Sequence, residues 1–346
     1  MQNVKLGQLI ELFDHKRKPL SKMQRIKYFG SIPYYGAAGI IDYVNDYLFE
    51  GEYILLAEDG TVKTKSNNPV LNLTKSNEKF WISNHAHIFK SKNIEQKYLY
   101  YLLSTIDISR YITGAVQPKI NQENLFNIDL RIHSNVNIRK HIVNTIGSID
   151  NLIESFNSMK ELLHKLMSAK LLIEECKIVS LDEYIILYDN MRKPLSSIER
   201  VGDKKYPYYG ATGILDYVSN YIFDEEYVLL AEDGSVMTSK ETPIVQYING
   251  KTWVGNHAHV LKTKNGLNLY SLYFILKDTN VKNAVTGAVQ MKINQANLKK
   301  IEIKLPVNLN EFNTLSISVM KEIINIDFKL DKLTKLKQKY LKKFFG

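Results

Sequence analysis

The chain has 346 residues, of which 45% are hydrophobic and 24% are charged, and its formal net charge is +10. This length suits two domains with a connecting element, and the apolar runs are too short for a membrane span, which argues against a membrane protein. Its one cysteine, Cys176, excludes a disulfide framework and a thiolate metal cluster, and because no apolar signal core follows the N-terminus we expect a cytoplasmic protein.

The first predicted domain, residues 1–135, is of a mixed α/β type. The short apolar run from Tyr53 to Ala57 stops at Glu58-Asp59-Gly60, as a buried strand that ends in a turn would. Further apolar patterns predict strands over residues 40–48 and 82–89 and a helix over residues 97–112. The polar loops between these elements are long enough to protrude, and such loops usually carry function.

A single long helix is predicted from Ile138 to Cys176, within a connecting segment of residues 136–177. Apolar residues recur there at spacings of three and four without an intervening proline, which is the seam that a helix presents to one partner. Lys160 is the one position of this seam that is not apolar. At about 1.5 Å per residue the helix is roughly 58 Å long, which is typical of a coiled coil or a spacer.

Residues 178–308 form a second predicted domain that repeats the first. Five blocks recur in the same order, beginning with Arg17-Lys18-Pro19-Leu20, which returns as Arg192-Lys193-Pro194-Leu195. The others are Pro-Tyr-Tyr-Gly-Ala, Leu-Leu-Ala-Glu-Asp-Gly, Asn-His-Ala-His and Thr-Gly-Ala-Val-Gln-x-Lys-Ile-Asn-Gln. The copies diverge most over residues 61–79 and 235–251, as expected of two readers with different targets.

The C-terminal segment, residues 309–346, predicts a second long helix, because apolar residues recur at spacings of three and four from Phe312 to Phe344. Two helices of like length and pattern are expected to pair. The first leads from the first domain to the second, whereas the other starts from the second domain, so they must run antiparallel. The predicted fold class is therefore α/β (α+β): two tandem domains joined by an antiparallel coiled coil, with a pseudo-twofold axis between them.

The Asn-His-Ala-His block allows two interpretations. His85 and His87, and likewise His257 and His259, have the residue type and the separation of metal ligands on one face of a strand. Such a site would make each copy a metal-dependent hydrolase. However, no third and fourth ligand has a convincing spacing, and a hydrogen-bonded structural histidine is commoner.

The candidate DNA-binding residues lie in loops of both copies. The net positive charge favours a polyanionic partner; Arg and Lys bind phosphate or guanine, and Gln and Asn pair with adenine. The repeated candidates are Arg17, Lys18, Gln117, Lys119 and Asn121, with their counterparts Arg192, Lys193, Gln290, Lys292 and Asn294. The candidates in the divergent loops after Gly60 and Gly234, where we expect base reading, are Lys63, Thr64, Lys65, Thr238 and Lys240. A scaffold role remains open for the repeated residues, because base readers should differ between the copies.

The order of blocks and helices resembles a known family. Two target-recognition domains that each carry Pro-Tyr-Tyr-Gly-Ala, Leu-Leu-Ala-Glu-Asp-Gly, Asn-His-Ala-His and Thr-Gly-Ala-Val-Gln-x-Lys-Ile-Asn, each followed by a long helix, look like the DNA-specificity subunit of type I restriction-modification systems or of their type IIB relatives. The resemblance covers essentially the whole chain. This chain is shorter than many members, and the segment from Lys335 onward has no place in the pattern.

The resemblance implies a non-catalytic subunit that reads a bipartite site on double-stranded DNA, with one half per domain and the helices setting the gap. It also implies methyltransferase subunits that use S-adenosylmethionine to methylate adenine, and a restriction subunit or a fused nuclease. No cofactor or metal is expected on this chain itself. Because the two copies have opposite directions about the axis, we expect the half-sites to be inverted relative to each other.

Overall fold

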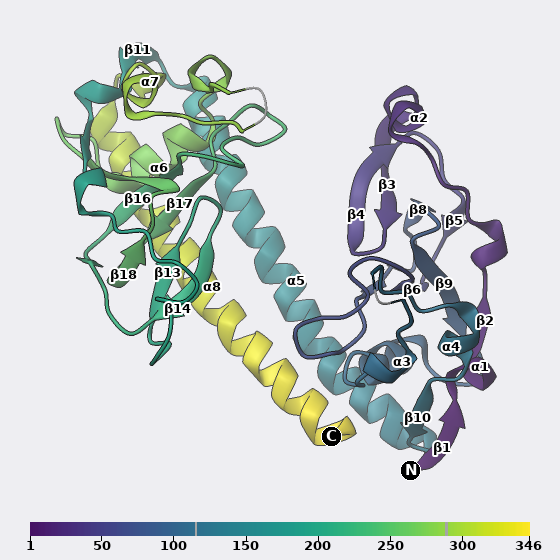
Figure 1. Ribbon diagram of the computed structural model, residues 1–346. Helices are drawn as coiled ribbons and strands as arrows, with labels where there is room; N and C mark the ends of the chain where they lie inside the picture. The colour runs from purple at the N-terminus through teal and green to yellow at the C-terminus, as the bar shows by residue number, and fades with distance from the viewer. Residues whose placement is uncertain (115, 288–289) are drawn as a thin grey trace. The chain divides into compact units, whose positions relative to one another are not determined.

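In a computed structural model, which describes residues 1–114, 116–287 and 290–346, the chain forms two compact units. Unit 1 consists of Met1–Glu154 and Leu330–Gly346, and unit 2 consists of Ser155–Lys329. Two long helices, α5 (Val136–Ile173) and α8 (Leu309–Phe345), each contribute one segment to both units (Figure 1). No helix in the described ranges has both the length and the apolar composition that crossing a bilayer requires.

The α/β part of unit 1 contains two four-stranded sheets and one two-stranded ladder. The sheets have the orders β2-β9-β6-β7 and β4-β3-β8-β5, while β1 pairs with β10. All neighbours are antiparallel except β3 and β8. The elements are β1 (Gln2–Lys5), α1 (Leu6–Leu9), β2 (Ile10–Leu12), α2 (Lys22–Lys27), β3 (Phe29–Gly36), β4 (Gly39–Val44), β5 (Phe49–Glu50), β6 (Ile54–Ala57), β7 (Leu71–Leu73), β8 (Lys79–Ile82), β9 (Ala86–Ser91), α3 (Gln96–Leu103), α4 (Gln122–Phe126) and β10 (Asp129–Ile132).

Unit 2 repeats this architecture, which confirms the duplication that the sequence predicts. Its sheets have the corresponding orders β12-β19-β16-β17 and β14-β13-β18-β15, and β11 pairs with β20. The elements are β11 (Cys176–Ser180), β12 (Ile185–Leu187), β13 (Tyr206–Tyr209), β14 (Ile214–Val218), β15 (Phe223–Asp224), β16 (Tyr227–Ala231), β17 (Val245–Ile248), β18 (Lys251–Val254), β19 (Ala258–Thr263), α6 (Leu269–Lys277), α7 (Gln295–Lys299) and β20 (Glu302–Pro306).

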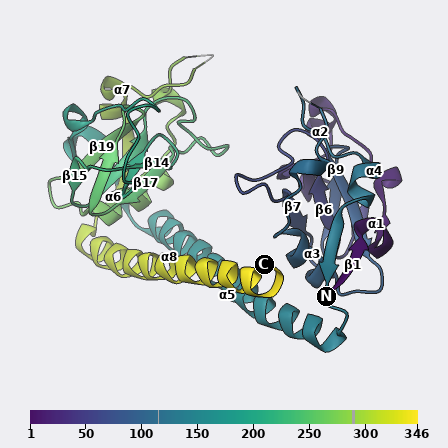
Figure 2. The same cartoon turned by 60° about the horizontal axis from the view of Figure 1, so that its bottom comes forward.

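Strand β6 is an inner strand of its sheet, and both of its faces are buried. Figure 2 shows it between β9 and β7. Successive side chains of a strand point to opposite faces: Ile54 and Leu56 pack in one apolar cluster with Leu99 of α3, and Leu55 packs in another with Phe80 of β8. A strand buried on both sides has an uninterrupted apolar run, and for this reason the sequence identifies it.

In unit 1 the segments of α5 and α8 run antiparallel. Asp150 of α5 forms a 2.6 Å ion pair with Lys337 of α8. His141, which precedes Asp150 on α5, contacts Phe344, which follows Lys337 on α8. Rising residue numbers on one helix therefore meet falling numbers on the other, as connectivity predicts.

In unit 2 the same antiparallel arrangement explains the polar position in the predicted seam. Lys170 pairs with Glu311 at 2.6 Å, and Lys160 pairs with Asp327. The Lys160 side chain is only 32% exposed, and a charge at such a site needs a partner of opposite sign. Lys160 is thus a paired seam residue.

Four of the predicted elements are shorter in the structure. The strand expected over residues 40–48 ends at Val44. The strand expected over residues 82–89 is two strands, because β8 ends at Ile82 and β9 begins at Ala86. The helix expected over residues 97–112 ends at Leu103, where the hydroxyls of Ser104 and Thr105 donate to nearby backbone carbonyls and compete with further helix formation. Helix α5 ends three residues before Cys176, which starts a strand.

Candidate nucleic-acid interface

In unit 1 the repeated motifs converge at the end of β6. The Glu58 N–H donates to the carbonyl of His85 (2.9 Å), and the Ile120 N–H donates to the carbonyl of Glu58 (2.8 Å). Asp59 and Lys119 face each other in an isolated antiparallel bridge. Backbone hydrogen bonds thus join loops that are far apart in the sequence, and unit 2 repeats all three contacts.

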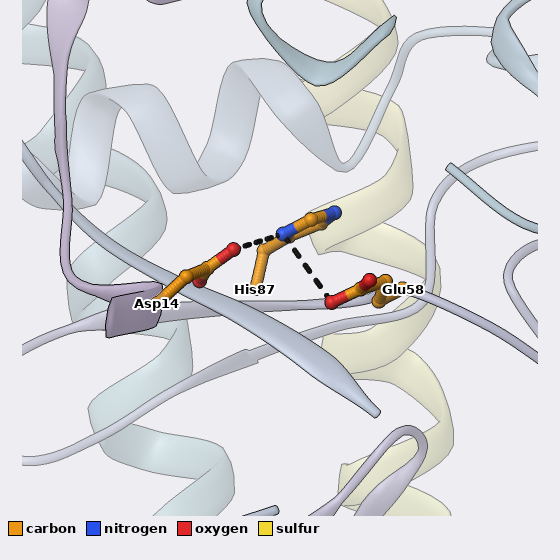
Figure 3. A group of neighbouring side chains, drawn as sticks. All are labelled: Asp14, Glu58 and His87. Carbon is orange, nitrogen blue, oxygen red and sulfur yellow. Dashed lines mark hydrogen bonds and ion pairs between the residues drawn. The ribbon is translucent and has the colours of Figure 1, made fainter. Parts of the chain in front are cut away.

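Next to these loops lies a buried ion network formed by Asp14, Arg17, Glu58 and His87. Figure 3 shows three of its members, Asp14, Glu58 and His87. Nδ1 of the fully buried His87 lies 2.6 Å from Asp14 and 3.7 Å from Glu58, and its Nε2 lies 2.7 Å from the carbonyl oxygen of Ile120. The Arg17 guanidinium lies 2.7 Å from Glu58 and 3.3 Å from Asp14. Unit 2 forms the same network from Asp189, Arg192, Glu232 and His259.

Both ring nitrogens of His87 face oxygen atoms of other residues. A backbone carbonyl is only an acceptor, so Nε2 must donate to Ile120; an ionised carboxylate is also only an acceptor, so Nδ1 must donate to Asp14. Only the doubly protonated ring donates from both nitrogens.

The two carboxylates are held in their charged form. Burial by itself raises the pKa of Asp14, but the hydrogen bond and positive charge of His87, the Ile88 N–H and Arg17 outweigh it and lower that pKa. The pKa of Glu58 is also lowered, because Arg17, His87 and Lys119 outweigh the effect of burial. Asp189 and Glu232 have lowered pKa values for the same reasons.

This geometry does not suit the metal-ligand interpretation of the Asn-His-Ala-His block. His85 lies in the turn before β9, where its ring contacts Asp59 and is 51% exposed, whereas His87 lies in β9 and is buried. The two rings therefore do not converge. Asp14, Glu58 and His87 do lie together, but a metal ion needs a deprotonated ring nitrogen, and both nitrogens of His87 donate to acceptors.

The predicted DNA-binding residues Arg17 and Arg192 form part of the buried ion networks, and their side chains are only 11% exposed. In contrast, Lys18 and Lys193 are exposed, and their carbonyls accept hydrogen bonds from Trp81 and Trp253. A role for the two arginines in DNA contact stays a prediction. Their observed contacts position the loops that carry the lysines.

The other repeated candidates lie on the same loops. Lys119 and Lys292 are about half exposed and reach Glu58 and Glu232 at 3.0 and 3.1 Å. The side chains of Asn121 and Asn294 accept hydrogen bonds from Asn124 and Asn297, which caps the short helices α4 and α7. Helix capping by Asn121 and Asn294 is an example of the scaffold role that the sequence analysis leaves open for the repeated residues.

The turn before Lys119 requires glycine. Gly114 has a φ of +86°, and a Cβ at that position would lie 2.3 Å from the carbonyl oxygen of Gln117. Gln117 and its counterpart Gln290 are exposed at this turn. Residues 115, 288 and 289 of the two Thr-Gly-Ala-Val-Gln blocks lie outside the described residues.

The variable loops, residues 61–70 of unit 1 and 235–244 of unit 2, share one backbone conformation. The Thr64 N–H donates to the carbonyl of Asn68 (2.8 Å), Asn67 has a φ of +63°, and its carbonyl accepts from the Ile108 N–H (3.1 Å). The same features recur at Thr238, Thr242, Glu241 and Val281, with distances of 2.8 and 2.9 Å and a φ of +62°. Despite their different sequences, the two loops are built on one frame.

The side chains on this frame differ in charge and in hydrogen bonding. Lys63 donates to Ser109 at 3.3 Å, whereas Met237 has the corresponding place in unit 2. Glu241 pairs with Lys282 at 2.6 Å. The predicted residues Thr64, Lys65, Thr238 and Lys240 are all exposed on these loops. A constant frame with variable exposed side chains is the arrangement expected of a sequence-reading surface.

Sequence reasoning missed Asp14 and Gln122, which complete the network in unit 1. Gln122 donates to Asp14 at 3.1 Å, and Gln295 donates to Asp189 at 2.7 Å. The repeat contained the signal, because an aspartate stands three residues before the arginine of the first block in both copies. A carboxylate at a constant distance from a repeated arginine is a candidate ion-pair partner.

The chain is similar to known proteins of one family. The type I restriction modification DNA specificity domain matches residues 1–164 and 173–343. A putative type I restriction enzyme specificity subunit of Haemophilus influenzae is 40% identical over 156 residues, which are 45% of this chain and 37% of that protein's length. The crystal structure of a type I restriction-modification S subunit from M. genitalium covers 100% of this chain and 96% of its own, with 16% identity and a TM-score of 0.57, which shows a shared fold.

Proposed function

The chain belongs to the type I restriction-modification DNA specificity family, and from this premise we propose that it selects the DNA site of a restriction-modification complex, with each unit reading one half of a two-part site. The prediction of a specificity subunit is confirmed by the family. Since the chain matches only 37% of the curated relative's length, substrate and partners are part of the proposal.

The variable loops carry this proposal. Both present exposed polar side chains on one backbone frame, and the side chains differ between the units. Base edges are distinguished by hydrogen-bond donors and acceptors, so different side chains on one frame select different bases. Residues that are the same in both units, such as Lys18 and Lys193, suit the phosphate backbone, which is the same at every base pair.

Partner subunits supply the chemistry in this proposal. Methyltransferase subunits that bind S-adenosylmethionine methylate adenine in the selected site, and a restriction subunit or a fused nuclease cuts DNA. The specificity chain itself binds double-stranded DNA and works in the cytoplasm. The helices α5 and α8 connect the two units and set the gap between the two half-sites.

An exchange of variable loops tests the proposal. Residues 63–68 are replaced by the sequence of residues 237–242, together with Asp107→Asn and Ser109→Lys, which supply the neighbours that Glu241 has in unit 2. Because the frames are alike, the graft should fold, and the half-site read by unit 1 should change toward that read by unit 2. Sequencing of methylated adenines in a host that carries the complete system measures both half-sites.

The half-site read by unit 2 is the internal control for this exchange, because its loop is unchanged. A thermal melt that matches the wild-type chain shows that the graft is folded. If a folded, active graft methylates the wild-type sequence at both half-sites, the variable loops do not read bases.

A second prediction concerns phosphate contacts of the variable loop. Lys65→Ala or Lys63→Ala should reduce the slope of log affinity against log salt concentration by about 0.9 if the lysine neutralises one phosphate. Titration of a labelled duplex at several salt concentrations measures this slope. Lys92→Ala is a matched control, because Lys92 is exposed beyond the opposite end of β9. An unchanged slope removes that lysine from the interface.

A further inference from the structure

An exposed histidine is held by an aspartate at the same place in each unit. Nδ1 of His85 lies 2.8 Å from Asp59, and Nδ1 of His257 lies 2.5 Å from Asp233. The two imidazole side chains are 51% and 47% exposed. Within the described residues, Nε2 of neither ring has a hydrogen-bond partner. The carboxylate therefore orients the ring, and Nε2 remains available.

Stability does not account for this pair. About half of each imidazole side chain is exposed to solvent, and solvent screens the interaction with the aspartate, so the histidine adds little to the stability of either unit. A carboxylate at Nδ1 instead has a directing effect, because it selects the ring orientation and the position of the proton. A ring that carries a proton on both nitrogens can donate Nδ1–H to the aspartate and Nε2–H to a second anion.

Two lysines lie on the loops next to His85: Lys18, and Lys119, which also pairs with Glu58 at 3.0 Å. Asp59 and Lys119 are partners in an antiparallel bridge, and side chains of directly opposed residues lie on one side with Cβ atoms about 5 Å apart. The carbonyl of Asn84, next to His85, accepts from Arg17, which is followed by the exposed Lys18. The buried ion network thus supports exposed donors in adjacent loops.

We propose that His85 with Lys119, and His257 with Lys292, bind the phosphodiester backbone of DNA, and that Asp59 and Asp233 are their positioning residues. This inference rests on the proposed function. The ligand is a phosphate rather than a base because both units present the same residues here, whereas the variable loops differ. The two sites therefore hold each unit against the duplex while the variable loops read it.

The test uses the complex with its methyltransferase subunits and two labelled duplexes, one with a methylated site of the system and one of scrambled sequence. His85→Ala and His257→Ala should each raise Kd by about tenfold or more for both duplexes, because a hydrogen bond to a charged group is lost. The double variant should show the product of the two factors, since the sites are independent. His85→Arg keeps a charged donor and should restore the affinity.

The role of Asp59 is tested in two backgrounds. Asp59→Ala should raise Kd when His85 is present and should have no effect in a chain with His85→Ala, a dependence that a purely structural role would not show. If the wild-type complex binds DNA, and His85→Ala and His257→Ala bind each duplex as tightly as the wild-type complex does, this inference is overturned and the proposed function stands. An effect on the specific duplex alone shows a base contact and also overturns it. Failure of the wild-type complex to bind either duplex overturns the proposed function together with the inference.

Discussion

Asp14→Ala lowers the free energy of unfolding of unit 1 by about 3 to 5 kcal/mol, the expected effect of removing one partner from a buried ionic network. Asp14 accepts hydrogen bonds from His87 (2.6 Å), the Ile88 N–H (2.9 Å) and Gln122 (3.1 Å). The substitution leaves these donors without an acceptor and leaves the imidazolium of His87 without its closest counter-charge. Urea denaturation followed by hydrogen exchange in peptides of unit 1 measures the loss.

Two variants serve as controls for Asp14→Ala. Asp189→Ala should destabilise unit 2 by a similar amount and leave unit 1 unchanged, because Asp189 has the same place in the second network. Asp129→Ala removes an exposed carboxylate that pairs with Lys5 and Arg110, and its effect should be much smaller because solvent screens exposed ion pairs. If Asp14→Ala and Asp129→Ala have equal effects, the buried network does not stabilise the unit.

The same carboxylates predict how stability depends on pH. The pKa of Asp14 is lower in the folded protein than its ordinary value, so its ionised form favours the folded state. This contribution is complete above the unfolded pKa of about 3.9 and is lost as pH falls through the lower folded pKa. Unfolding curves of the wild-type chain should therefore shift steeply below about pH 4, and those of Asp14→Ala should shift less.

Deletion of residues 330–346 should unfold much of unit 1 while unit 2 keeps its stability. Tyr340, Leu341, Phe344 and Phe345 of this segment pack against the core of unit 1. The ring of Phe345 lies 5.5 Å from that of Tyr98. Removal of four large apolar side chains from such contacts costs on the order of 5 kcal/mol, which is comparable to the whole stability of a small domain.

Hydrogen exchange distinguishes the units after this deletion. Amides of β6 and β9 should exchange faster, whereas those of β16 and β19 should keep wild-type rates. Phe344→Ala with Phe345→Ala should reproduce part of the loss, and Lys342→Ala with Lys343→Ala, which alters only exposed neighbours, should not. Wild-type protection of β6 in the shortened chain would show that unit 1 does not need this segment.

The elements that the sequence predicts well are those in which one local pattern is sufficient. The seam of α5 extends over ten turns of helix, and β6 is apolar at every position because both of its faces are buried. The segment from Lys335 onward follows the same helical pattern, yet no pattern shows that it belongs to unit 1. That assignment depends on contacts with residues far away in the sequence.

The histidines show the same limit at the site. His85 and His87 are separated by one residue, and a strand would place both on one face. The turn at residues 83–85 instead leaves His85 exposed, and β9 carries His87 into the interior against Asp14. Burial and pairing partners are tertiary properties, so the sequence alone could not assign different roles to the two rings.

The composition of unit 1 from two distant parts of the chain also affects its biosynthesis. Residues 1–154 are synthesised first. Residues 330–346, which pack against their apolar core, are synthesised only after residues 155–329. At about 5 to 20 residues per second, this interval lasts about 9 to 35 s. All residues of unit 2 are therefore synthesised before unit 1 is complete. The nascent N-terminal half is the part that a chaperone must shield longest.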